Sequence, residues 1–132
     1  MNDYKLEINR SDLLGMLSKY YSEKLNKKIA VKESHKIDCV GLYEDEAVTV
    51  RIFFTEEISL LGRIATKTTE VTREDIRNIL NEALEDDNYR VKEIFFDSGT
   101  TTTGSYMGEY EEAYFNGIEV TVEEKSLSRV LK

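Results

Sequence analysis

The chain has 132 residues, of which 40% are hydrophobic and 33% are charged, with a formal net charge of -8 and a pI near 4.8. This length and composition predict one globular domain, residues 1–132, with one continuous core. The acidic balance argues against a protein whose main task is to coat DNA or RNA, and against attraction to anionic membranes, because both need clustered Lys and Arg.

The N-terminal sequence, the lengths of the apolar runs and the cysteine content predict the cellular location of the protein. The N-terminal sequence MNDYKLEINR lacks the basic-then-apolar order of a signal peptide. The longest apolar runs fall far short of the roughly 20 residues that span a bilayer. We therefore expect a cytoplasmic protein without membrane contact. Cys39 is the only cysteine, which excludes an internal disulfide and a thiolate-rich metal site within one chain.

The first part of the chain predicts a strand, a capped helix and further strands. Residues 4–8 alternate apolar and polar, as in a half-buried strand. Asn9, with Asp12 three residues later, is typical of a helix start, and the helix is expected to end near residues 24–26. Strands are predicted over residues 28–33 and 37–42, with a polar turn at 44–46. The apolar stripe of the helix is Leu13, Met16, Leu17, Tyr20 and Tyr21.

The middle of the chain has the strongest strand pattern. Residues 47–54, AVTVRIFF, place apolar side chains on one face throughout. Glu56 and Glu57 then indicate a turn. Residues 58–71 are rich in β-branched side chains, and we expect one long strand that is bent or bulged near Gly62.

The last part repeats the order of the first. Thr72 and Asp75 predict a second capped helix, followed by a strand over residues 89–97. Residues 98–108 are rich in Gly and Thr and predict a mobile loop or a twisted hairpin. Asn116-Gly117 favours a two-residue hairpin turn that pairs EAYF with IEVTVEE. The apolar stripe of the second helix is Ile76, Ile79, Leu80, Ala83 and Leu84.

The order strand, helix, strand, strand thus occurs twice, in pseudo-repeats over residues 4–57 and 66–125. Residues 7–10 (Glu-Ile-Asn-Arg) match residues 70–73 (Glu-Val-Thr-Arg). The match fits internal duplication, and it also fits two unrelated helices with the same capping needs. Either interpretation predicts an α+β fold, with a mainly antiparallel sheet of about six to eight strands that carries both helices.

Residues 72–99, TREDIRNILNEALEDDNYRVKEIFFDSG, provide a family resemblance. This run resembles small uncharacterised accessory proteins of bacterial conjugative elements and phages, in which a strand, a Thr-capped helix and an Asn-Tyr-x-Val strand often follow one another. The resemblance implies an accessory protein of a mobile element. It assigns no activity and no functional residue.

The sequence offers little for catalysis, cofactors or metals. His35 is the only histidine, and on a strand it would lie some 13 Å from Cys39, too far for a Cys-His pair. The acidic clusters at residues 44–46 and 86–87 lack the order of a calcium loop. Residues 98–104, SGTTTTG, lack the Lys and the following helix of a phosphate-binding loop. We therefore expect no enzyme, no cofactor and no metal.

Residues 105–115, SYMGEYEEAYF, are the candidate partner-binding stretch. Tyrosine recurs there at every fourth position, and Tyr and Met are enriched in interface cores, whereas acids suit a basic partner. A strand whose tyrosines cover the core edge is the competing interpretation. The candidate residues are Tyr106, Met107, Glu109, Tyr110, Glu111, Glu112 and Tyr114. The leading hypothesis is a small acidic, non-enzymatic protein that binds a basic protein partner, as a nucleic-acid mimic or inhibitor.

The alternative hypothesis is a nucleic-acid-binding module. Arg51, Arg63 and Lys67 lie on predicted strands and could form a basic sheet face. Exposed strand edges would also allow a homodimer by edge pairing. A second set of basic residues occupies matching positions in the two halves, each beside an acid: Arg10, Arg73, Lys32 and Lys92.

Overall fold

The computed structural model describes residues 3–38, 47–105 and 108–125, and the predicted α+β class is confirmed. The described residues form two α-helices, one 3-10 helix and six strands. In chain order the elements are β1 (Asp3–Asn9), α1 (Arg10–Leu25), β2 (Lys32–Asp38), β3 (Ala47–Leu60), β4 (Arg63–Glu70), α2 (Arg73–Leu84), η1 (Glu85–Asp87), β5 (Tyr89–Ser105) and β6 (Gly108–Glu124).

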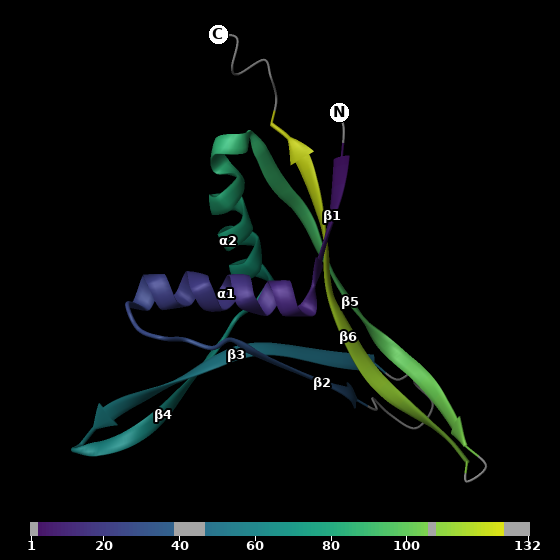
Figure 1. The fold of residues 1–132 in the computed structure, drawn as a ribbon, viewed down its shortest axis with the longest axis horizontal. Coiled ribbons are helices and arrows are strands. Elements are labelled where there is room, and N and C mark those ends of the chain that lie inside the picture. The colour runs from purple at the N-terminus through teal and green to yellow at the C-terminus, as the bar shows by residue number, and fades with distance from the viewer. Residues whose placement is uncertain (1–2, 39–46, 106–107, 126–132) are drawn as a thin grey trace.

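The strands form two three-stranded antiparallel sheets, ordered β1-β6-β5 and β2-β3-β4, where the sequence predicted one larger sheet. The first strand of each half pairs with the last strand of the other half, β1 with β6 and β4 with β3. Each half therefore completes the sheet of the other. Figure 1 shows α1 lying across the β2-β3-β4 sheet and α2 running along β5, while the β3-β4 and β5-β6 hairpins extend beyond the helices.

Both helices begin at the predicted caps. The Asn9 side chain accepts a hydrogen bond from the backbone N–H of Asp12 at 2.8 Å. Thr72 accepts from the backbone N–H of Asp75 at 3.1 Å, and the Asp75 carboxylate accepts from the backbone N–H of Thr72 at 2.9 Å. These bonds satisfy backbone donors that have no partner within the first helical turn. Each helix start is thereby fixed directly at the end of the strand before it.

A polar side chain on each helix also forms a hydrogen bond with the segment that follows that helix. Ser18 on α1 accepts a hydrogen bond from the backbone N–H of Val31 at 2.8 Å. Asn81 on α2 accepts from the backbone N–H of Val91 at 2.7 Å. Each polar side chain thus satisfies a part-buried backbone donor that would be costly to leave unpaired. In both halves this bond ties the helix to the segment that leads into the next strand.

One hydrophobic cluster joins the two halves. The ring of Tyr21 on α1 packs against Phe54 on β3, with centroids 4.7 Å apart. The predicted stripes face this cluster, except that Ala83 is exposed. Its buried members are Leu13, Leu17, Ile29, Val31, Ile52, Phe54, Val71, Ile76, Ile79, Leu80, Val91, Ile94, Phe115, Ile118, Val120 and Val122.

The predicted turn at Glu56 and Glu57 is wrong. β3 continues through both residues, and the chain reverses at Leu61 and Gly62, whose φ angles are 53° and 71°. Gly62 is therefore the end of a hairpin and not a bend within one long strand. The pattern misled because β3 and β4 run beyond the core as a two-stranded ribbon, where charged residues such as Glu56 and Lys67 pair across the strands.

The predicted hairpin turn at Asn116-Gly117 is also wrong, because β6 continues through it. Gly117 has a φ of 140° and lies opposite Asn9 on β1 and Asp97 on β5. A Cβ at this position would lie 2.1 Å from the backbone oxygen of Ile8. The glycine therefore serves the close approach of β1 to β6, at a point where the β5-β6 register shifts.

Three other predictions concern residues 98–105, the start of β2 and residues near Cys39. β5 runs through residues 98–105 and pairs with β6, so of the two forms predicted there, a mobile loop and a hairpin, the hairpin is confirmed. β2 begins at Lys32, so residues 29–31 precede the strand. Cys39, the expected turn at residues 44–46 and the tail from residue 126 lie outside the described residues.

Candidate functional site

The predicted partner-binding stretch is only partly described. Tyr106 and Met107 lie outside the described residues, as do the side chains of Glu109 and Tyr110. Residues 108–115 belong to β6, so the stretch is a strand there and not a helix. Whether it binds a partner stays a prediction.

Three other candidate residues of that stretch are described, and one of them, Tyr114, has a packing role. Glu111 and Glu112 are exposed on β6. Tyr114 is half-buried and lies opposite Gly99 on β5, where a Cβ would come within 2.7 Å of the tyrosine hydroxyl. The ring thus covers a strand glycine that has no side chain of its own, which is a known way to stabilise such a pair.

The basic residues of the alternative hypothesis do not share one face. Cross-strand register places Arg63 and Lys67 opposite Leu60 and Glu56, whereas Arg51 lies on the other side of the β3-β4 ribbon. Arg51 donates a hydrogen bond to Glu70, which raises the pKa of the guanidinium, and its side chain lies over the ring of Phe53 at 5.3 Å. Arg51 is thus engaged within its own sheet.

Most other predicted basic or polar candidates also have local partners. Arg10 pairs with Glu33 at 2.9 Å, and Glu33 pairs in turn with His35 at 2.6 Å. Arg73 lies over the ring of Phe96 at 4.9 Å, and Lys92 pairs with Asp3 at 3.0 Å. Lys32 is exposed at the start of β2. Residues 98–104 are paired in β5, so their strand geometry does not form a phosphate cradle.

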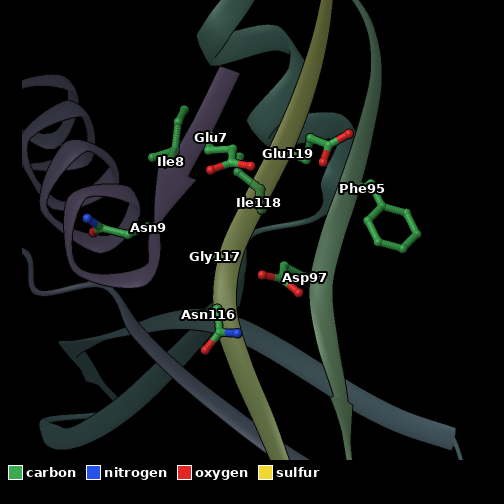
Figure 2. Close-up of a pocket in the computed structure, with 9 residues that line it drawn as sticks. All are labelled: Glu7, Ile8, Asn9, Phe95, Asp97, Asn116, Gly117, Ile118 and Glu119. Atoms are coloured by element: carbon green, nitrogen blue, oxygen red, sulfur yellow. The ribbon is translucent and has the colours of Figure 1, made fainter. Parts of the chain in front are cut away.

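The structure instead contains an acidic pocket on the outer face of the β1-β6-β5 sheet, opposite the helices. We call it the Gly117 pocket. Its volume is about 460 Å³, and it opens where β6 lacks a side chain at Gly117. Figure 2 shows Glu7 reaching toward β6 from one side and Asp97 from the other, with the ring of Phe95 beyond β5, on the side away from β6. The lining residues are Glu7, Ile8, Asn9, Phe95, Asp97, Asn116, Gly117, Ile118 and Glu119.

Ion pairs cover the outer face of this sheet only up to the pocket. Toward the end of the sheet where β1 begins, Lys92 pairs with Asp3 at 3.0 Å and Arg90 with Glu123 at 2.6 Å. At the pocket itself, a largely exposed Lys5 pairs with a half-buried Glu119 at 3.1 Å. Among the described residues, Glu7 and Asp97 have no basic partner. The pocket therefore carries a local excess of negative charge.

The register makes this excess unfavourable for folding. Glu7 lies directly opposite Glu119 on neighbouring antiparallel strands, and like charges in that position destabilise a sheet by a few tenths to about 1 kcal/mol. Phe95, also opposite Glu119, is 62% exposed. Neither the unpaired acids nor the exposed ring contributes to the core.

The second sheet offers an internal comparison. Glu70 on β4 occupies the position that Glu7 occupies on β1, at the end of the strand and just before the helix. Glu7 lies opposite Glu119, two residues from Gly117, whereas Glu70 lies opposite Phe53, two residues from Arg51. Arg51 neutralises Glu70. The corresponding place beside Glu7 holds a glycine and therefore no cation.

No family model, curated protein or solved structure matches this chain. Within the described residues, the structure has no helix long and apolar enough to cross a membrane. Within the same residues, no three His, Cys, Asp or Glu side chains are grouped to hold a metal ion.

Sequence reasoning missed this pocket. The alternation of residues 4–8 did place Glu7 on the polar face of a strand, and IEVTVEE places Glu119 likewise. Which strand lies beside β1 could not be deduced, because β1 and β6 come from opposite ends of the chain. Interpreting Gly117 as a turn also separated Glu119 from Asp97, which the continuous strand brings close to each other.

Proposed function

We propose that this chain is a non-enzymatic binding protein whose Gly117 pocket receives an arginine side chain of a basic protein partner. The proposal keeps the leading hypothesis from the sequence and moves its site from residues 105–115 to the β1-β6-β5 sheet. A pocket of about 460 Å³ can enclose a guanidinium group together with part of its aliphatic stem.

The observation that carries the proposal is the comparison of the two sheets. In one sheet a guanidinium of the chain itself, that of Arg51, pairs with Glu70 and lies over the ring of Phe53. In the other sheet the matching place beside Glu7 is open, because Gly117 supplies no side chain. An arginine from a partner would supply the missing charge there, as Arg51 does for Glu70.

The chemistry of the pocket favours arginine over lysine. A guanidinium is planar, can donate to Glu7 and Asp97 at the same time, and stacks on an aromatic face such as that of Phe95. A lysine ammonium is a compact and strongly hydrated charge, which gains less from two separated carboxylates and an exposed ring. We therefore expect the pocket to discriminate between the two cations.

The class of partner follows from the same chemistry. Arginine side chains that bind nucleic acid contact phosphate oxygens, and carboxylates on an acidic surface can occupy the places of those phosphates. We propose a nucleic-acid-binding protein as the partner and mimicry or inhibition as the outcome. The resemblance of residues 72–99 to accessory proteins of conjugative elements and phages supports a mobile-element setting, in the bacterial cytoplasm.

The experiment compares two variants that remove the same charge. Glu7→Gln/Asp97→Asn alters the pocket, and Glu111→Gln/Glu112→Gln alters the exposed acids of β6. Binding of oligo-arginine and oligo-lysine peptides of equal length is measured by fluorescence anisotropy at several salt concentrations. We expect the pocket variant to weaken oligo-arginine binding about tenfold or more, since a charge-assisted hydrogen bond contributes roughly 1.5–3 kcal/mol.

The other results have equally definite meanings. Equal losses in both variants would show that only net charge matters, which contradicts a pocket. Equal affinity for the two peptides contradicts the guanidinium assignment. A loss confined to the Glu111/Glu112 variant would return the site to residues 105–115. Affinity that does not fall with salt would exclude an electrostatic interface of any kind on this exposed surface.

A further inference from the structure

The end of the β3-β4 hairpin is apolar and exposed to solvent. Leu60 is 56% exposed, Leu61 100% and Ile64 79%. Cross-strand register pairs Leu60 with Arg63 and Ser59 with Ile64, so Leu60 and Ile64 lie on opposite faces of the ribbon. Leu61 sits at the very end. The hairpin thus ends in an apolar knob, which we call the Leu61 tip, with Arg63 as its charged neighbour.

Leu61 is an unexpected residue for this turn. Leu61 and Gly62 both have positive φ, 53° and 71°, which is the geometry of a two-residue type I′ hairpin. Asn, Asp or Gly normally occupies the first of these positions, because a larger side chain is strained there. The positive φ strains this leucine, and its full exposure means that it gains no stability from burial. Neither backbone conformation nor burial therefore explains a leucine at this position. Its exposed side chain is then available for contact with another molecule.

An apolar groove lies elsewhere on the same chain, between β1 and the end of α2. It has a volume of about 390 Å³. Leu6 on β1 is 45% exposed. Leu84 forms the opposite wall, and Asp87 stands at the rim without a basic partner among the described residues. The lining residues are Tyr4, Leu6, Leu84, Asp87, Tyr89 and Val122.

We propose that the Leu61 tip of one copy inserts into this groove of a second copy. A knob with apolar side chains on both faces needs a recess with two apolar walls, and the groove has them. Charge agrees as well, since Arg63 beside the tip would meet Asp87 at the rim. Figure 1 shows the hairpin end far from the elements that form the groove, so one chain cannot fill its own groove. This inference is independent of the arginine pocket.

Such a contact is heterologous, because two different surfaces meet. Every added copy leaves one tip and one groove free, so association continues into short chains of molecules instead of stopping at a closed dimer. A few side chains bury less area than the roughly 1,200 Å² of a stable interface. We therefore expect weak association that rises steadily with protein concentration.

Sedimentation velocity over a range of concentrations tests the proposal. The wild-type chain should form a series of oligomers, whereas Leu61→Asp and Leu6→Asp should each be monomeric. An equimolar mixture of these two variants should form dimers and nothing larger, because one variant retains only its groove and the other only its tip. A monomeric mixture of two folded variants would overturn the proposal, as would a wild-type chain that stays monomeric throughout.

Charge reversal keeps the test valid if Leu6→Asp fails to fold. Arg63→Glu and Asp87→Lys change exposed residues and should each weaken association about threefold or more, whereas the double variant should recover it. Equal association of all four chains would contradict the Arg63-Asp87 contact. Binding of the wild-type chain to phosphatidylcholine vesicles that is lost in Leu61→Asp, with no association between copies, would assign the tip to lipid and overturn the proposal.

Discussion

Gly117→Ala is the substitution that most directly tests the packing of β1 on β6. The added Cβ would lie 2.1 Å from the backbone oxygen of Ile8 and 2.8 Å from the Cα of Asn9. Both are backbone atoms, so no side-chain rotation relieves the clash. Losing about two hydrogen bonds at the end of this ladder costs about 2 kcal/mol, and a φ of 140° costs an alanine roughly 1 kcal/mol more. We expect destabilisation of about 3 kcal/mol.

Urea unfolding followed by far-UV circular dichroism measures the effect. Two other glycines act as controls. Gly15 has no atom within 4 Å of an added Cβ, so Gly15→Ala in α1 should stabilise the chain by about 0.5–1 kcal/mol. The atoms nearest to a Cβ added at Gly99 belong to the Tyr114 side chain, which can rotate away. If Gly117→Ala changes stability by less than about 0.5 kcal/mol, as an ordinary surface substitution does, the close approach of the two strands is refuted.

Three further predictions concern Glu7, Leu61 and Tyr21. Glu7→Thr removes the repulsion opposite Glu119 and should stabilise the chain by about 0.5 kcal/mol at low salt while weakening oligo-arginine binding; lower stability in urea unfolding would contradict the like-charge argument. Leu61→Asn suits the positive φ of the turn and should raise the free energy of unfolding by about 1 kcal/mol; a decrease would show that the leucine is packed. Burial raises the pKa of the Tyr21 phenol in the folded state, so its contribution to stability is complete below the ordinary pKa of about 10 and is lost as pH rises through the higher folded value. Tyr21→Phe should therefore lose less stability than the wild-type chain above about pH 10 in thermal unfolding, and an unchanged pH profile would contradict this assignment.

Local chemistry made the helices predictable. Asn9 and Thr72 were identified as caps because a free backbone donor needs an acceptor at a fixed spacing, and that need is met within a few residues. The strand core over residues 47–54 was equally clear, since burial on one face enforces alternation. These features depend on neighbours in sequence, and the structure agrees with them.

The errors lie where a strand leaves the core or meets a distant one. Glu56 and Glu57 resemble a turn because polar residues suffice in a ribbon that no core covers. Asn116-Gly117 has the composition of a hairpin turn, but the glycine is required by β1, which lies at the other end of the chain. The Gly117 pocket depends on the same long-range pairing, so local patterns do not reveal it.

Gly117 has two roles that cannot be separated by substitution at that position. The absence of a side chain lets β1 approach β6, and it also leaves open the space beside Glu7 that Arg51 fills in the other sheet. Any residue introduced at 117 to close the pocket would push β1 away as well. A loss of binding in such a variant would therefore not distinguish a filled site from a damaged fold. Substitution of the carboxylates of Glu7 and Asp97 avoids this problem, since both side chains are exposed and their removal relieves repulsion instead of creating a clash.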